Sequence, residues 1–186
     1  MAFPSLLSRR ARRARQPAGE LYAAIVAQAR APVFFRDLGV PDTIDGRFEM
    51  VALHAFLVLV RLKAEGTAGA DLAQALFDTF FEDMDRSLRE MGASDLGVGR
   101  RVKAMAQGFY GRIRAYERGL AGTADELADA LRRNLLGTVP SPSAAHVAML
   151  ARYLRLQREA LAAQRAADFA AGSVAFLPAT SAVLEE

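Results

Sequence analysis

The sequence contains no cysteine and no tryptophan, and its two histidines are His54 and His146. Without cysteine the chain cannot form disulfides, perform thiolate catalysis or hold zinc or iron–sulfur clusters through sulfur. Neither histidine has a carboxylate three or four residues away, the spacing that carboxylate-bridged metal sites in helical bundles require. We therefore expect no metal site and no cofactor, and we expect His54 to be a hydrogen-bonded helix residue.

Long hydrophobic runs and the common catalytic motifs are also missing. The longest apolar run, residues 50–60, is about half of the roughly 20 residues that a membrane-spanning helix needs, so it predicts a buried core helix and no transmembrane segment. The chain contains none of the glycine-rich patterns of nucleotide-binding loops and no nucleophile elbow. We assign no catalytic residue and expect a protein that is not an enzyme.

Positive charge is concentrated at the N-terminus. Without the five arginines of residues 1–16, the chain has 19 basic and 21 acidic side chains, so its net charge of +3 does not indicate a DNA-binding surface. Residues 1–19 are predicted to be a basic, flexible arm. The arm either contacts an anionic membrane or RNA, or is a solvated tail. The membrane-contact residues would be Arg9, Arg10, Arg12, Arg13 and Arg15.

The rest of the chain has the apolar periodicity of packed helices. Helices are expected near residues 21–29, 45–64, 71–91, 95–116, 123–136 and 142–167. The loop after the first helix should pack onto the core through Phe34, Phe35, Leu38 and Val40, and an extended segment should carry Val174 and Phe176 across the bundle. These features predict an all-α fold, a single bundle-like domain of about six helices over residues 20–178, with a polar tail at 179–186.

The stretch from residue 71 to 116 predicts an antiparallel helical hairpin. Its first helix carries acidic side chains outward and its second carries basic ones, and Gly92 separates them. The expected core residues are Phe77, Phe80, Met84, Leu88, Met105 and Phe109.

The acidic side chains of this hairpin allow two interpretations. Asp78, Glu82 and Asp85 share one helical face and could hold magnesium against a diphosphate substrate, which would make the chain a helical enzyme. The favoured interpretation is a solvated face with ion pairs Glu82–Arg86 and Asp85–Arg89.

Two glycines in the second hairpin helix also need an explanation. Gly108 and Gly111 are unfavourable inside a helix, so they predict a close approach by another helix, either of this chain or of a partner. Tyr110 and Arg112 beside them are residue types enriched at interface hot spots.

Together these segments resemble the ubiquinol–cytochrome c chaperone family over about residues 20–136. The resemblance is carried by Gly39-Val40-Pro41-Asp42-Thr43 with Asp45-Gly46-Arg47-Phe48-Glu49, Phe81-Glu82-Asp83-Met84-Asp85, Leu88-Arg89-Glu90-Met91-Gly92, Ser94-Asp95-Leu96 with Val98-Gly99, Val102-Lys103-Ala104-Met105, and Phe109-Tyr110-Gly111-Arg112 with Tyr116.

The resemblance implies a non-enzymatic assembly chaperone that binds newly made cytochrome b during assembly of the respiratory ubiquinol–cytochrome c reductase. Its partner would be cytochrome b or another subunit of that complex. It would work in the cytoplasm, peripherally at the inner membrane, in a bacterium, or on the matrix side in a eukaryote. The expected partner-binding residues are Asp83, Asp85, Arg89, Asp95, Lys103, Tyr110 and Arg112.

Overall fold

The structure, a computed structural model, describes residues 6–90 and 95–183, and in these residues it is helical without any strand. The all-α prediction is confirmed. The elements in chain order are α1 (Leu6–Ala29), α2 (Pro32–Arg36), α3 (Ile44–Lys63), α4 (Thr67–Glu90), α5 (Asp95–Ala121), α6 (Ala124–Arg133), α7 (Ala144–Ala162), α8 (Ala166–Ala170) and the 3₁₀ helix η1 (Ala179–Ala182).

Helix α3 lies at the centre and contains the longest apolar run of the sequence. The Thr43 side chain caps its N-terminus by accepting a hydrogen bond of 3.1 Å from the Gly46 backbone N–H. Helices α1, α4 and α7 pack around it, and Met50 to Val58 are all buried. The predicted buried core helix is therefore confirmed.

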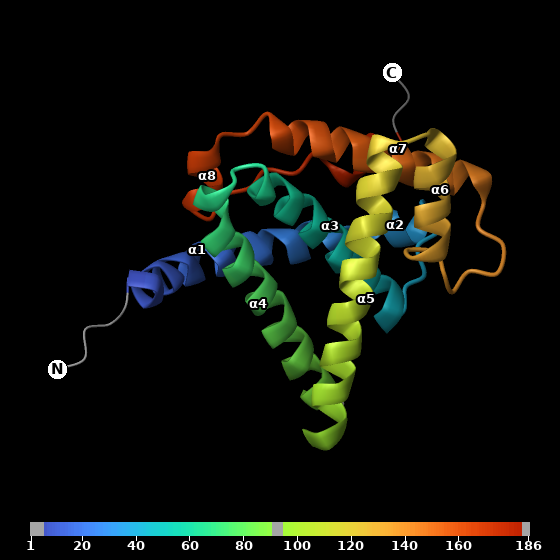
Figure 1. Ribbon diagram of the computed structural model, residues 1–186. Helices are drawn as coiled ribbons and strands as arrows, with labels where there is room; N and C mark the ends of the chain where they lie inside the picture. Colours follow the sequence, from blue (N-terminus) through green and yellow to red (C-terminus); the bar gives the residue numbers. More distant parts are fainter. Residues whose placement is uncertain (1–5, 91–94, 184–186) are drawn as a thin grey trace.

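Helices α4 and α5 form the predicted antiparallel hairpin. They approach each other at the hairpin end and separate toward α7 and α8, and the hairpin end extends beyond the rest of the body (Figure 1). Aromatic rings hold its base: Phe80 and Phe109 are 1% and 0% exposed, and their ring centroids are 5.2 Å apart. Phe77, Met84 and Met105 are half-buried against this core. The bend at residues 91–94 lies outside the described residues.

The first helix begins much earlier than the predicted boundary at residue 20. Helix α1 starts at Leu6 and runs through the arginine-rich segment, with Pro17 inside it. Ala14 and Ala18 are buried and continue the stripe of Leu21 and Ile25, since all four recur at three- and four-residue steps. Small alanine side chains allow α1 to pack closely on α4. The arginine-rich composition of this segment gave no indication of that packing.

The loop and C-terminal predictions hold in outline. Phe34, Leu38 and Val40 are buried, as expected, and Phe34 belongs to the short helix α2. The capping box of Thr123 and Glu126 starts α6, which ends at Arg133. Helix α7 begins at Ala144, after Ser143, two residues later than predicted, and ends at Ala162, about five residues earlier than predicted.

Residues 173–178 form the expected extended segment, and two glutamines hold it, Gln157 within α7 and Gln164 just after its end. Gln164 donates to the Ala175 carbonyl (2.7 Å) and accepts from the Ala175 N–H (2.9 Å), and Gln157 makes the same pair of bonds with Leu177 (2.8 and 3.1 Å). Each side-chain amide thus takes the place of a neighbouring strand. Val174 and Phe176 pack against the core, as predicted.

His54 is fully buried and hydrogen-bonded, as the sequence predicted. Its Nδ1 bonds the Met50 carbonyl at 2.8 Å, which assigns the proton to Nδ1, and its Nε2 then accepts from the Tyr153 hydroxyl at 2.8 Å. The same hydroxyl accepts from Gln28 Nε2 at 2.9 Å. Burial lowers the pKa of His54 from 6.5 to about 4, so this ring is neutral at pH 7.

Candidate functional site

A groove of about 660 Å³ lies where the hairpin meets the body of the protein. Its volume is within the range of ligand pockets. Side chains of α1, the first turns of α3, the second half of α4, the inner side of α5 and the connection after α6 form its walls. The apolar side chains that line it are Val26, Ile44, Phe48, Val51, Met84, Leu88, Met105 and Leu135.

Long, flexible apolar side chains dominate the hairpin wall of this groove. Met84 and Met105 are only half-buried, and Leu88 is also partly exposed. Ile44, on the opposite wall, is 69% exposed, the largest exposure among the described large hydrophobic side chains. Methionine is unbranched and polarizable, so a wall of this kind adapts to differently shaped apolar partners. No part of the described chain covers these apolar walls, so the groove can accept the apolar side chains of a partner.

Two polar pairs contribute to the lining of the groove. Arg112 on α5 binds both carboxylate oxygens of Glu49 on α3, one of them at 2.7 Å. Its guanidinium also lies over the Phe48 ring, 5.7 Å from the centroid. Gly108 gives this side chain room, because a Cβ there would lie 2.7 Å from Arg112 Nη1. The pair joins the two walls and neutralises a carboxylate that is almost completely buried.

The second pair joins α1 to α4. The Tyr22 hydroxyl donates to Asp83 Oδ2 at 2.8 Å, and Arg86 lies 3.8 Å from the other oxygen of the same carboxylate. Burial and the hydrogen bond to Asp83 raise the pKa of Tyr22 above its ordinary value. Glu49 and Asp83 are therefore both paired, and the remaining lining combines the apolar side chains with the charged side chains of Arg30, Asp45, Arg47 and Arg133.

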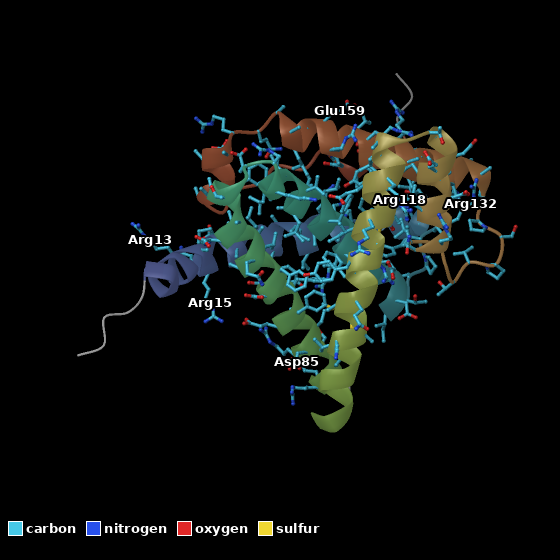
Figure 2. The ribbon with its side chains drawn as sticks, viewed as in Figure 1. Arg13, Arg15, Asp85, Arg118, Arg132 and Glu159 are labelled. Atoms are coloured by element: carbon cyan, nitrogen blue, oxygen red, sulfur yellow. The ribbon has the colours of Figure 1, made fainter. Side chains whose placement is uncertain are left out.

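The structure separates the predicted partner-binding residues into groups. Asp83 and Arg112 line the groove, where each supports a wall, and Lys103 and Tyr110 lie on the exposed side of α5. Asp85 and Arg89 bind each other on α4, with Nε and Oδ2 2.6 Å apart, as the favoured interpretation predicted (Figure 2 labels Asp85). The side chain of Asp95 lies outside the described residues.

Sequence reasoning missed the wall opposite the hairpin. Ile44, Tyr22 and the inward role of Glu49 were not predicted, because the residues of this wall are far from the hairpin in sequence. One signal was available: Glu49 and Arg112 both belong to the segments that carry the family resemblance, and they are opposite charges on two apolar helix faces.

The three carboxylates of the magnesium hypothesis turn to separate partners. Asp78 accepts from Gln74 (2.8 Å), Glu82 pairs with Arg15 of α1 (3.1 Å) and Asp85 pairs with Arg89. The expected pair Glu82–Arg86 is wrong, since Arg86 turns to Asp83. Over the described residues, no group of three or more acidic or histidine side chains could hold a metal ion. This arrangement does not favour a magnesium site.

The predicted membrane-contact arginines are partly described. Arg13 and Arg15 are exposed on α1 (Figure 2), and Arg15 forms the pair with Glu82. The side chains of Arg9, Arg10 and Arg12 lie outside the described residues. Within the described part of the chain, no helix combines the length and hydrophobicity needed to cross a bilayer.

Comparison with known proteins identifies the relatives of this chain. The crystal structure of the Cbp3 homolog from Brucella abortus is 40% identical and superimposes with a TM-score of 0.80, covering 92% of this chain and 94% of that one. Ubiquinol-cytochrome c reductase complex assembly factor 1 of Homo sapiens is 27% identical over 85% of this chain, and the mitochondrial protein CBP3 of Saccharomyces cerevisiae is 30% identical over 80%. The chain spans about half the length of these two relatives, 53% and 45%.

The family profile described as ubiquinol-cytochrome C chaperone matches residues 36–176. This match continues past residue 136, where the resemblance found in the sequence ended, and includes α7 and most of the extended segment. It covers both walls of the groove except α1. The chain therefore belongs to the ubiquinol–cytochrome c chaperone family.

Proposed function

We propose that this chain is an assembly chaperone of the ubiquinol–cytochrome c reductase and that its groove holds an apolar segment of newly made cytochrome b. Its relatives in frog, human, mouse and fly are named assembly factors of that complex. The observation that carries the proposal is the uncovered apolar wall of Met84, Leu88 and Met105 facing the exposed Ile44.

The chemistry of the groove suits a temporary hold on a membrane protein. A newly made membrane segment exposes long apolar side chains, and burying them stabilises a complex by about 25 cal/mol for each Å² removed from water. An amphipathic or apolar helix lying in a hydrophobic groove is a recurring mode of recognition. Binding is all that this role requires, so the protein acts without catalysis and without a cofactor.

The place where the chain would act follows from the protein that it is proposed to bind, cytochrome b. The chain would act at the membrane surface, on the cytoplasmic side of the inner membrane in a bacterium or the matrix side in a mitochondrion. The arginines of α1 would strengthen that contact, by about 1 kcal/mol for each arginine near an anionic surface. Arg13 is free for this role, since its exposed side chain has no ion pair among the described residues.

A matched pair of substitutions in the native cell tests the proposal. Ile44→Lys places a charge at the groove, and Val183→Lys places the same charge at another exposed apolar residue, which is 42% exposed and does not line the groove. Both positions are exposed, so each variant should change the free energy of unfolding by less than about 0.5 kcal/mol.

We expect Ile44→Lys to lower the spectroscopically measured cytochrome b content and the reductase activity of membranes several-fold, with Val183→Lys indistinguishable from the unaltered chain. Equal cytochrome b content in both variants would remove the groove from the function. If deleting the whole chain also left cytochrome b and reductase activity at normal levels, the assembly role itself would be lost.

A further inference from the structure

The outward side of α5 carries a straight stripe of exposed polar side chains. Successive members are three or four residues apart and lie on one face of the helix, over about 22 Å. Met105, Phe109 and Arg112 occupy the opposite, inward side of the same helix. The α5 stripe, as we name it, consists of Lys103, Gln107, Tyr110, Arg114 and Arg118.

The positive charges of the α5 stripe are not neutralised within the described part of the chain. Lys103, Arg114 and Arg118 make no ion pair there, and the nearby Glu117 is paired with Lys63 at 3.1 Å. Most acidic side chains of the neighbouring helix α4 that form ion pairs bind arginines of α1 or of α4 itself. The stripe therefore presents three cations to the surroundings; Figure 2 labels Arg118 among them.

An aromatic ring lies at the middle of the α5 stripe. Tyr110 is 52% exposed, yet its ring is held in place by stacking on Phe77, with centroids 5.5 Å apart and planes 30° apart. A rigid tyrosine with an arginine one turn away is typical of interface hot spots, because tyrosine offers a large contact area at little entropic cost.

Gly111, next to Tyr110, meets nothing in the described part of the chain that would require a glycine. It is exposed in the middle of a helix, where glycine is unfavourable relative to alanine, and a Cβ added there would meet nothing within 4 Å. The alternative of a close internal helix crossing is therefore wrong for Gly111. The missing side chain lowers the surface of α5 at the one point beside the exposed ring.

We propose that the α5 stripe is a docking surface for an acidic helix of a second protein, whose backbone approaches α5 at Gly111. The three cations match acidic side chains along such a helix, and Tyr110 would pack on its surface. A membrane surface or a nucleic acid would also attract the cations, but neither needs a glycine for close approach. This surface is separate from the groove, so it can be occupied whatever the groove holds.

The test places the photocrosslinking residue p-benzoyl-phenylalanine at position 107, in the middle of the stripe, in the native cell. We expect a discrete protein adduct whose crosslinked peptide is an acidic helical segment. Reversing the stripe charges by Lys103→Glu, Arg114→Glu and Arg118→Glu should reduce the adduct about tenfold or more, and reversing the acids of the partner segment in the same cell should restore it. The control Arg132→Glu changes an exposed cation on α6 that already pairs with Asp129, and it should leave the adduct unchanged (Figure 2).

Gly111→Ala separates docking from folding. In the isolated chain it should raise Tm by about 2–4 °C, because alanine favours the helix and the added methyl group meets nothing. The same substitution should reduce the adduct at position 107. Crosslinking to lipid or RNA only, an adduct that charge reversal does not change, or an undiminished adduct with Gly111→Ala would each overturn the proposal.

Discussion

The two ends of the core differ in whether the chain itself covers their apolar side chains. Around His54, between α3 and α7, each hydrogen-bonding group of the histidine, Tyr153 and Gln157 side chains has a partner, and the extended segment 173–178 covers them. At the hairpin, the polar pairs are equally complete, but Met84, Leu88 and Ile44 remain without cover. One end is closed by the chain itself, and the other is left open in the described part of the chain.

If the proposed function is right, this difference predicts which substitutions change stability and which change binding. Substitutions at the closed end should unfold the protein, because they leave buried groups unpaired or leave a cavity. Substitutions on the open wall should change what the protein binds and should change its folding little. The following predictions test that separation, beginning with the largest expected effect.

Phe80→Ala should reduce the free energy of unfolding by about 3–5 kcal/mol. Phe80 is 1% exposed and contacts the rings of Tyr22, Phe48, Phe81 and Phe109, so truncation leaves a cavity at the base of the hairpin. Urea denaturation gives the measurement. Met84→Ala, one helical turn further along the same face, is the matched comparison and should cost far less, since its side chain lies half-buried in the groove wall. Equal losses in the two variants would contradict the division between the buried core and the open groove wall.

Acidification should weaken the closed end through His54. Burial holds the pKa of His54 at about 4, below the unfolded value of 6.5, so the unfolded chain binds its proton first as the pH falls. The contribution of neutral His54 to the free energy of unfolding is complete above pH 6.5. It is lost between pH 6.5 and 4, by about 3 kcal/mol in total.

The control for this pH effect is His54→Gln. It should be less stable than the unaltered chain at pH 7 but should lose less stability on acidification, when both are measured by urea denaturation across this range. Parallel curves for the two proteins would show that His54 is not the group that titrates.

Gln157→Ala should lower the free energy of unfolding by about 1–3 kcal/mol. It leaves the Leu177 N–H without its partner, while the Leu177 carbonyl keeps its hydrogen bond from Gln28. Hydrogen exchange should report faster opening of residues 173–178 in this variant, and unchanged protection there would mean that the glutamines do not hold the segment.

The sequence carried most of the information about the closed end and only part of that about the open one. The apolar stripe of α3, the hairpin, the start of a helix near residue 123 and the packing of Val174 and Phe176 all follow from local sequence patterns, and all are confirmed. The start of α1 was missed because burial of Ala14 and Ala18 depends on α4, which no local pattern reveals. Of the site, Asp83 and Arg112 could be named, but their roles as supports depend on Tyr22 and Glu49, more than 60 residues away in sequence.

The central claim is that the groove, and not the remainder of the surface, holds cytochrome b. Its most direct test is site-specific photocrosslinking in the native cell, with the same crosslinking residue placed at position 44 in one strain and at position 183 in the other. Both side chains are exposed, and only the first lines the groove. We predict an adduct with cytochrome b from position 44 and none from position 183. Adducts of equal yield from both positions, or from position 183 alone, would contradict the account.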